Sequence, residues 1–131
     1  MIPKYRAWDK VNGTMHKVAG INFGINGGRV ISLAETNRYN NNHKRWHTDV
    51  ELLQSTGLFD KNGTEIYEGD IVKHEPVPNP FISNAYFEII QARSGEWRMD
   101  NYRGGQVLAF SNHEVEVVGN KFEHPHLLGE E

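Results

Sequence analysis

The sequence predicts a mostly β protein, with a small N-terminal antiparallel meander, an SH3-like, partly open β-barrel and a short C-terminal helix or turn. Two observations predict this class. Short runs alternate apolar and polar residues, as strands with one buried face do, and Asn-Gly, Gly-Gly and Ser-Gly dipeptides separate the runs. The length of 131 residues fits one compact domain. We place the meander in residues 1–55 and the barrel in residues 56–131, and we expect the two parts to form one compact unit.

Turn signals divide the N-terminal part into three strands. Asn12-Gly13 is typical of a two-residue hairpin turn, because both residue types tolerate positive φ angles. It separates strands that we predict near residues 5–8 and 15–23. Gly27-Gly28 is a second turn, and the β-branched run RVISLAE predicts a third strand over residues 29–35. These three strands form the antiparallel meander.

Residues 36–48 interrupt the alternation. Their sequence, TNRYNNNHKRWHT, has neither a strand period nor a helical period and is rich in asparagine, which favours turns. We therefore predict a surface loop. The DVELLQSTG that follows predicts a short strand, because Ser55-Thr56-Gly57 would stop a helix almost as soon as it formed.

The segment TGLFDKNGTEIYEGDIVKH, residues 56–74, contains two turn signals close together. The DKNG sequence predicts a tight turn, and residues 68–70 predict a second turn before an alternating strand. Asp60 and Asp70 can each accept hydrogen bonds from N–H groups of their own turn. Burial must offset the entropy cost of two chain reversals, and we expect it from Leu58, Ile66, Tyr67, Ile71 and Val72. We interpret the segment as scaffold, with the motif residues Thr56, Gly57, Leu58, Asp60, Asn62, Gly63, Ile66, Tyr67, Gly69, Asp70, Ile71 and Val72.

Short strands continue to the C-terminal end. Residues 76–81 hold three of the five prolines and predict a loop between two strands. The run AYFEIIQARSGEWRMDN predicts two strands joined at Ser94-Gly95, GGQVLAF a further short strand, and HEVEVVGN a cleanly alternating one. Residues 121–128 predict a turn or short helix against the barrel. The residues expected on the inner faces are Trp97, Met99, Val115, Val117, Phe122, Leu127 and Leu128.

Three motifs together resemble the YopX family of phage and prophage proteins. They are KYRAWD near the start, LLQSTGLFDKNGTEIYEGDIV in the middle and VEVVGNKFEHPHLL near the end, in the family's order. The departures are Phe59, where a polar residue is usual, and His124-Pro125-His126 in place of a more acidic tail. The resemblance implies a mostly β protein encoded by a phage or prophage of a bacterial host, with a tendency to form large homo-oligomers. It implies no established activity.

Composition narrows the classes of function. The chain has no cysteine, which removes disulfides, thiolate nucleophiles and Cys-based zinc sites. The net charge of −3 gives no strong overall field toward nucleic acid or anionic lipid. The N-terminal sequence lacks the apolar run of a signal peptide, and no segment is long and apolar enough to span a membrane. We expect a soluble protein in the cytoplasm of the bacterial host, without a cofactor.

Histidines and carboxylates give no clear sign of a metal or catalytic site. His43 and His47 are four residues apart in a segment that is unsuited to a helix, and His124 and His126 flank a proline next to Glu123. We predict no metal site from either pair. A carboxylate pair would have to come from Asp60, Glu65, Glu68 and Asp70, for which turn roles are available. We therefore predict no catalytic residue and no enzyme activity.

Aromatic and cationic residues alternate in two places and mark a candidate binding surface. Its residues are Lys44, Arg45, Trp46, Arg93, Trp97, Arg98, Tyr102 and Arg103. Stacking on the rings and phosphate contacts from the cations would suit nucleic acid. The simpler interpretation is that Trp97 is core, Tyr102 caps it, and the arginines are solvated beside Glu96 and Asp100. We favour the simpler interpretation in a chain of net negative charge.

Assembly is the leading interpretation of function. Small β-barrels with irregular loops often serve as binding modules, and exposed strands of the meander could pair with another copy. We expect a non-enzymatic, oligomeric accessory protein whose partner is itself, with another phage or host protein as a further possible partner. Binding to phage or host DNA or RNA is the alternative, and no membrane partner is expected.

Overall fold

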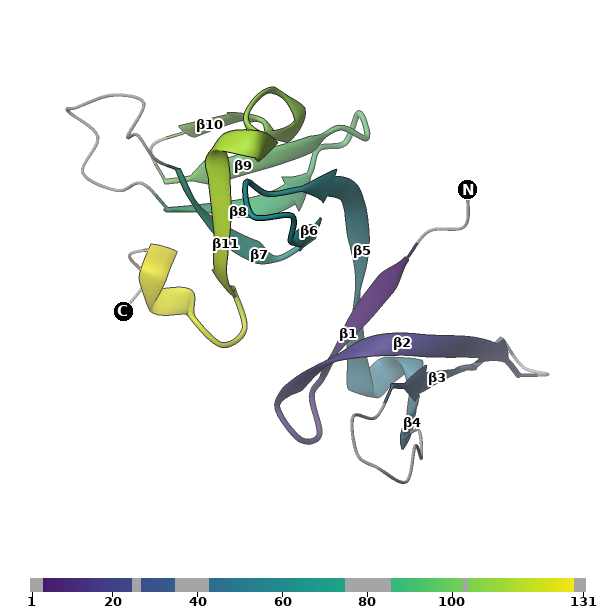
Figure 1. The fold of residues 1–131 in the computed structure, drawn as a ribbon. Coiled ribbons are helices and arrows are strands. Elements are labelled where there is room, and N and C mark those ends of the chain that lie inside the picture. Colours follow the sequence, from purple (N-terminus) through teal and green to yellow (C-terminus); the bar gives the residue numbers. More distant parts are fainter. Residues whose placement is uncertain (1–3, 25–26, 35–42, 75–85, 103, 129–131) are drawn as a thin grey trace. The chain divides into compact units, whose positions relative to one another are not determined.

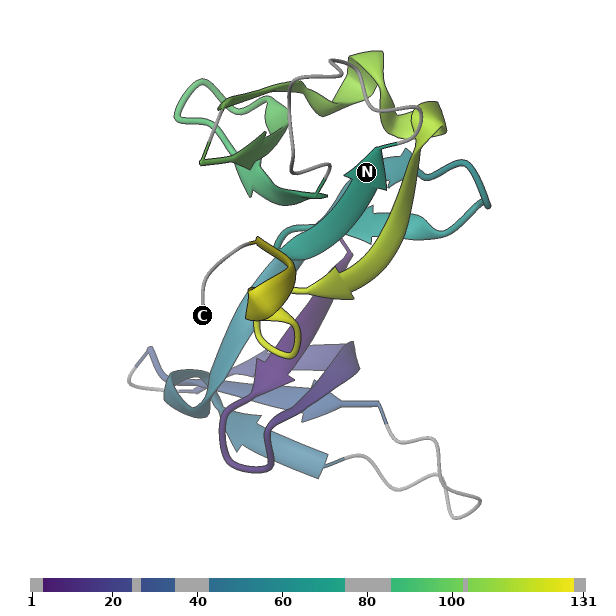
Figure 2. The same ribbon diagram turned by 90° about the vertical axis from the view of Figure 1, so that its left-hand side faces the viewer.

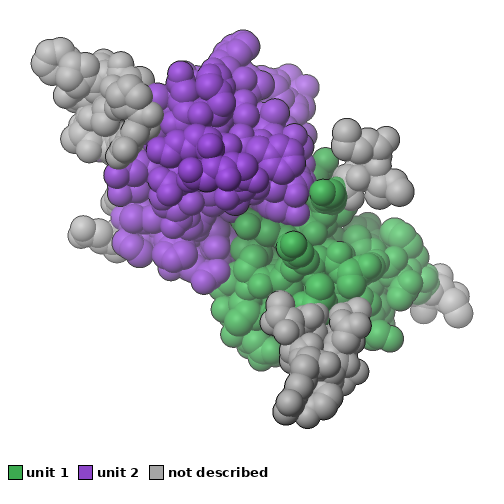
Figure 3. Space-filling view, in the orientation of Figure 1, with its two compact units in different colours: residues 1–54 green, residues 55–131 purple. Residues whose placement is uncertain are grey.

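The structure is a computed structural model, and it describes residues 4–24, 27–34, 43–74, 86–102 and 104–128 (Figure 1). The predicted mostly β class is confirmed, because these residues form antiparallel sheets with a few short 3-10 helices. The chain divides into two compact units, residues 1–54 and 55–131, which Figure 3 colours separately. Strand β5 (Val50–Phe59) begins in the first unit and ends in the second. None of the helices in the described parts is long and apolar enough to cross a membrane.

The first unit is an antiparallel sheet with the strand order β4-β3-β2-β1-β5. Its elements are β1 (Tyr5–Asp9), β2 (Thr14–Phe23), β3 (Arg29–Leu33), β4 (His43–Trp46), the 3-10 helix η1 (His47–Asp49) and the first half of β5. The predicted hairpin is confirmed, but its loop consists of residues 10–13 and is longer than the two-residue turn expected, since Asp9 pairs with Thr14. Gly13 in this loop has a φ of 66°, and its N–H donates to Asp9 O at 2.8 Å. Figure 2 shows the strands of this sheet from a second direction.

One face of this sheet carries the core of the first unit. Residues that alternate along β1 and β3 bury their side chains on that face, because successive side chains of a strand point to opposite sides. The core residues are Ala7, Ile31, Leu33 and Val50, with Val18, Ile21 and Leu52 packed against them. On the opposite face of these strands, the half-buried Val30 lies between Asn22 of β2 and the exposed Trp46 of β4.

The loop predicted over residues 36–48 is wrong for residues 43–48, and residues 36–42 lie outside the described residues. Residues 43–46 form strand β4, which pairs with β3 in the register Val30↔Trp46 and Ser32↔Lys44. Residues 47–49 form η1. The strand exists because β3 offers a free edge and because Arg45 finds an ion-pair partner in Asp9 on β1, at 3.1 Å. Neither reason can be read from the local composition.

The second unit contains a five-stranded antiparallel sheet in the order β10-β9-β8-β7-β11. Its elements are the rest of β5, β6 (Glu65–Tyr67), β7 (Asp70–His74), β8 (Tyr86–Gln91), β9 (Trp97–Asn101), β10 (Gly104–Val107), η2 (Leu108–Phe110), η3 (Asn112–Glu114), β11 (Val115–Asn120) and η4 (Pro125–Leu128). Strands β10 and β11 are its edges, so the described strands do not close a barrel. The strands predicted on each side of Ser94-Gly95 and the final short helix are confirmed.

A single apolar cluster fills the second unit. It comprises Ile66, Val72, Phe87, Ile89, Met99, Leu108 and Val115, with Leu58, Trp97 and Val117 packed against it. The predicted faces, Trp97 with Met99 and Val115 with Val117, are therefore confirmed. Of the five core residues predicted in segment 56–74, Ile66, Ile71 and Val72 are fully buried, whereas Leu58 and Tyr67 are half-buried. The predicted loop at 76–81 lies outside the described residues.

The strand predicted for the segment DVELLQSTG is confirmed, and it is longer than expected, because β5 continues to Phe59. The Thr56 hydroxyl donates to Ile66 O at 2.7 Å and accepts from Leu58 N at 3.1 Å. The register between β5 and β6 shifts between Ser55 and Phe59, and these two hydrogen bonds replace backbone bonds that a regular pairing would make there. Gly57 has a φ of 77° at this irregularity. The strand bends here instead of ending.

Asp60 and Asp70 have the structural roles predicted for them. One oxygen of Asp60 accepts from Asn62 N and Thr64 N, both at 2.8 Å, and the other accepts from Val117 N at 2.9 Å. Asp70 Oδ2 accepts from Tyr67 N at 2.8 Å. The turn glycines of this segment, Gly63 and Gly69, have φ angles of 81° and 84°. The segment thus links its own turns to the last strand of the sheet.

Candidate functional site

The candidate binding surface divides between the two units. Lys44, Arg45 and Trp46 lie on β4 of the first unit, whereas Arg93, Trp97, Arg98 and Tyr102 lie on or beside β9 of the second. Arg103 is outside the described residues. Each half is therefore considered by itself.

Two residues of the second-unit half have structural roles. Trp97 packs against the apolar cluster, as the simpler interpretation expects. Arg98 forms two 3.1 Å hydrogen bonds to the carboxylate of Asp100, two positions along the same strand face. This hydrogen bonding and the charge of Asp100 raise the pKa of Arg98 above its ordinary value. The cation is thus balanced locally, although Arg93 and Tyr102 remain exposed.

Arg45 is also a structural residue. Its Nε donates to Oδ1 of Asp9 at 3.1 Å, and the side chain of Asp9 is only 1% exposed. Burial by itself would raise the pKa of Asp9. The hydrogen bond and charge of Arg45, together with the N–H of Val11 at 3.0 Å, outweigh burial and lower that pKa below its ordinary value. The pair fixes β4 to the core side of the sheet.

Lys44 and Trp46 lie on the opposite face of β4 and are both exposed. The Trp46 side chain is 59% exposed, and its ring lies over Gly28: a Cβ at that glycine would be 3.3 Å from Trp46 Cζ3. On β2, Lys17 alternates with the core residue Val18 and therefore lies on this same face. We call the residues Lys17, Gly28, Lys44 and Trp46 the Lys–Trp face.

Sequence reasoning missed Lys17, Gly28 and also Arg29, whose guanidinium lies 5.9 Å from the ring centre of Phe23 at the end of the same sheet. Phe23 is 75% exposed. A signal was available in the sequence, since the segments of β2, β3 and β4 contain no Asp or Glu. It could be used only once these three segments were known to be neighbouring strands.

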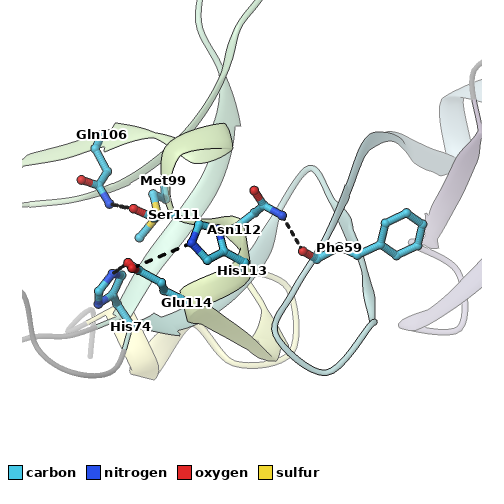
Figure 4. A network of polar contacts seen from close by, with 8 residues as sticks. All are labelled: Phe59, His74, Met99, Gln106, Ser111, Asn112, His113 and Glu114. Atoms are coloured by element: carbon cyan, nitrogen blue, oxygen red, sulfur yellow. Dashed lines mark hydrogen bonds and ion pairs between the residues drawn. The ribbon is translucent and has the colours of Figure 1, made fainter.

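A polar network occupies the second unit around η2 and η3 (Figure 4). The buried His74 at the end of β7 places Nε2 at 3.1 Å from Glu114 Oε2, and His113 lies 3.9 Å from the other oxygen. Gln106 donates to the Ser111 hydroxyl at 2.6 Å and approaches the sulfur of Met99 at 3.9 Å. Asn112 donates to Phe59 O at 2.7 Å. The network joins the η2–η3 connection to β7, β9 and β10.

This network has the residue types of a catalytic triad but not the arrangement of one. Ser111 is 6% exposed, and its hydroxyl accepts a hydrogen bond from the side-chain amide of Gln106. An amide cannot act as the base that a serine nucleophile needs. His74 forms its hydrogen bond with Glu114, the last residue of η3, and not with Ser111 (Figure 4). His74 and Glu114 were missed from sequence because 40 positions separate them. We assign the network a structural role.

One histidine of each pair that could have bound metal accepts a hydrogen bond from the backbone. His47 Nδ1 accepts from Arg29 N at 3.1 Å, and His124 Nδ1 accepts from Asn120 N at 3.2 Å. Glu123 accepts from the Asn120 side chain at 3.0 Å. Within the described ranges, no three His, Asp or Glu side chains are grouped so that they could hold a metal ion.

The edge strand β10 is the second notable surface. It pairs with β9 on one side only, and its sequence is Gly-Gly-Gln-Val. Two large exposed aromatic residues flank it: Tyr102, 69% exposed, precedes the strand, and Phe110, 75% exposed, follows it. We call β10 with Tyr102 and Phe110 the β10 edge.

The chain is similar to known proteins over its whole length. The family model described as YopX protein matches residues 4–129, a range that includes all three motifs of the resemblance. The solved structure of protein EF1440 from Enterococcus faecalis is 26% identical, with a TM-score of 0.66 over 98% of this chain and 99% of that one. YopX from Bacillus subtilis is 18% identical, with a TM-score of 0.62 over 95% and 97%, a likeness of fold. No curated protein matches the chain.

Proposed function

Because the chain belongs to the YopX family, we propose that it is a phage- or prophage-encoded accessory protein that acts without catalysis as a homo-oligomeric interaction or assembly module. The phage origin and a place in the bacterial cytoplasm follow from what the family resemblance implies. A non-enzymatic role is supported by the structural use of polar groups that could otherwise serve chemistry. Asp60, Asp70 and His74 each have hydrogen-bond partners that fix turns or helices.

We further propose that the second unit is an SH3-like, partly open barrel. The order β10-β9-β8-β7-β11 supports this, because the first and last strands of the series, β7 and β11, are neighbours. The two edges of that sheet, β10 and β11, are consecutive strands joined by η2 and η3, and a barrel forms when such edges approach each other. The register irregularity between Val117 and Gly119 in β11 supplies a bend of the kind found at barrel corners.

The observation that carries the assembly proposal is the β10 edge. Four edge strands end the sheets of the described residues, namely β4, β6, β10 and β11. Natural edge strands are commonly protected from pairing by charged residues. Three of these edges contain such residues: Lys44 and Arg45 in β4, Glu65 in β6 and Glu116 in β11. Strand β10 contains none.

A second copy of the chain is the partner that fits this edge. In an antiparallel ladder every second residue of β10 directs its N–H and C=O away from β9, and these groups can bond to the same groups of another β10. Such a contact is self-complementary, as a two-fold interface requires. Tyr102 and Phe110 at the two ends of the edge would then be covered, and aromatic residues are typical of interfaces. A dimer is the smallest assembly that this contact makes.

The prediction is a particle of at least twice 15.0 kDa in solution. Light scattering of the full chain should give such a mass, and the double variant Tyr102→Lys with Phe110→Lys should lower it, because like charges would meet at the contact. Phe23→Lys is the matched control, since Phe23 is also 75% exposed but lies in the first unit, and the mass should not change. A monomer at high concentration, or an unchanged mass in the double variant, would contradict the proposal.

A further inference from the structure

The Lys–Trp face has the composition of a site for single-stranded nucleic acid. Lys17 lies on β2, Lys44 and Trp46 lie on β4, and Gly28 directly precedes β3, which pairs with both of these strands. Trp46 offers an exposed ring, and Lys17 and Lys44 are exposed cations. Single strands are bound without sequence preference by this combination, because every base can stack on a ring and every nucleotide carries a phosphate.

Charge balance distinguishes this face from the cationic half of the second unit. Within the described residues, Lys17 and Lys44 form no ion pair, whereas Arg98 is balanced by Asp100. Strands β2, β3 and β4 contain no carboxylate at all, and the cation of Arg45 is neutralised on the other face by Asp9. The positive charge of the Lys–Trp face is therefore left for a ligand.

The distribution of charge along the chain points the same way. Residues 1–54 have eight Lys and Arg against four Asp and Glu, a net charge of +4. Residues 55–131 have six against thirteen, a net charge of −7. The two values add to the −3 of the whole chain. A basic unit attracts phosphate backbones even when the chain as a whole is acidic.

The exposed ring of Trp46 lies against the backbone at Gly28. Gly28 has no side chain, so the ring can lie against the backbone of the residue that precedes β3. The residues beside Lys44 on this face have small side chains. Ser32 lies opposite Lys44, and Gly20 lies opposite Ser32. A Cβ added at Gly20 would meet nothing within 4 Å. An extended nucleic-acid strand that crosses the sheet from Trp46 to Lys17 would therefore pass Val30, Ser32 and Gly20, none of which is aromatic or charged.

From these observations we propose that the Lys–Trp face binds single-stranded nucleic acid, with Trp46 stacking on a base and Lys17 and Lys44 contacting phosphates. Neither stacking nor phosphate contact distinguishes the sugar, so single-stranded DNA and RNA are equivalent ligands for this face. Duplex DNA is a poorer ligand, because its bases are already stacked on one another. An acidic protein would satisfy the lysines but would not use the ring.

The test is fluorescence anisotropy of labelled dT20 and U20 oligonucleotides with the full chain at low salt. We expect binding of both, and Trp46→Ala should weaken it by about 5- to 150-fold, the range for loss of one stacked base. Lys17→Gln and Lys44→Gln should each reduce the slope of log affinity against log salt by about 0.7. Circular dichroism would establish that each variant is folded.

Two exposed residues of the second unit provide matched controls. Phe59→Ala removes an aromatic residue that is 48% exposed, and Arg93→Gln removes an exposed cation, and neither should alter binding. The proposal is overturned if neither oligonucleotide binds, or if Trp46→Ala binds as tightly as the parent chain. Equal affinity for duplex DNA or for polyglutamate would also overturn it, since charge alone would then explain the binding.

Discussion

At the scale of single residues, the carboxylate of Asp60 joins the first turn of segment 56–74 to strand β11. Its two oxygens accept three backbone N–H groups, two from its own turn and one from β11. The residue is 6% exposed, so water cannot replace these bonds readily if the carboxylate is removed. Each N–H left without a partner then carries its own desolvation cost.

Replacement of Asp60 by Ala should destabilise the protein by roughly 3 to 5 kcal/mol, because three buried donors lose a charged acceptor. Urea unfolding followed by tryptophan fluorescence would measure it. Lys61→Ala is the neighbouring control and should change stability by less than about 0.5 kcal/mol, since Lys61 is exposed and lies 4.0 Å from Glu116. Equal effects of the two substitutions would contradict the scaffold role of the segment.

The Asp9–Arg45 pair makes the stability of the first unit depend on pH. The pKa of Asp9 is lower in the folded protein than its ordinary value, so the carboxylate contributes stability above that ordinary value. The contribution is lost as pH falls through the lowered folded pKa. Replacing Arg45 removes the cation and leaves burial, which raises the pKa of Asp9, as the main influence.

Arg45→Met should therefore lower stability at pH 7 by about 2 kcal/mol or more and move the loss of stability on acidification to higher pH. Urea unfolding at intervals between pH 3 and 7 would show both effects. Lys44→Met, on the adjacent position with an exposed side chain, should leave the pH profile as it is. If the two variants gave the same profile, Asp9 and Arg45 would not be coupled.

At the scale of elements, the turns and strand faces that depend on neighbouring residues were predicted correctly from the sequence. The hairpin at Asn12-Gly13 and the turns at residues 60–63 and 68–70 follow from residue types that tolerate or favour those backbone angles. The alternation in β9 and β11 predicted which of their side chains share a face toward the core. These features depend on a few neighbouring residues, so one sequence was enough to find them.

Prediction failed where an element depends on a distant partner. Strand β4 has only the residues HKRW, and it is a strand because β3 lies beside it and Asp9, 36 positions away, balances Arg45. The Lys–Trp face was missed for the same reason. Lys17 and Trp46 are brought to one face by two rounds of strand pairing, which no local pattern encodes.

Strand β10 illustrates how one glycine can determine whether an element forms. Gly105 lies opposite Asp100, and a Cβ at this position would collide with the Asp100 side chain and with the carbonyl of Met99. Gly105→Ala should separate β10 from β9 and destabilise the second unit by about 1 to 3 kcal/mol. Gly20→Ala is the control, because its added Cβ meets nothing within 4 Å, and it should be nearly neutral.

Hydrogen exchange would measure this at the level of single amides. Protection of the β9 and β10 amides should fall in Gly105→Ala, while protection in β7 and β11 changes much less. The same variant should also reduce the mass of the assembled protein, since the β10 edge would no longer be ordered. Unchanged protection in β10 would mean that the strand tolerates the added methyl group by moving as a whole.

At the scale of the whole molecule, net charge was a misleading average. The value of −3 disfavoured nucleic acid as a ligand, but it combines a basic unit and an acidic unit of unequal size. The boundary that separates them falls within β5, between residues 54 and 55, one residue from the division that the sequence suggested. Charge summed over each unit is the quantity that bears on a ligand of that unit.

The hydrogen bond that Val117 N donates to Asp60 also bears on when each unit can complete its sheet during synthesis of the chain. Every residue that the first unit needs has been synthesised once residue 54 is in place. The second unit places its first turn against β11, 57 positions later, so its sheet and that turn cannot be completed until nearly the end of the chain is available. The order of the contacts along the chain therefore allows the sheet of the first unit, with the Lys–Trp face, to form earlier in translation than the sheet that contains the β10 edge.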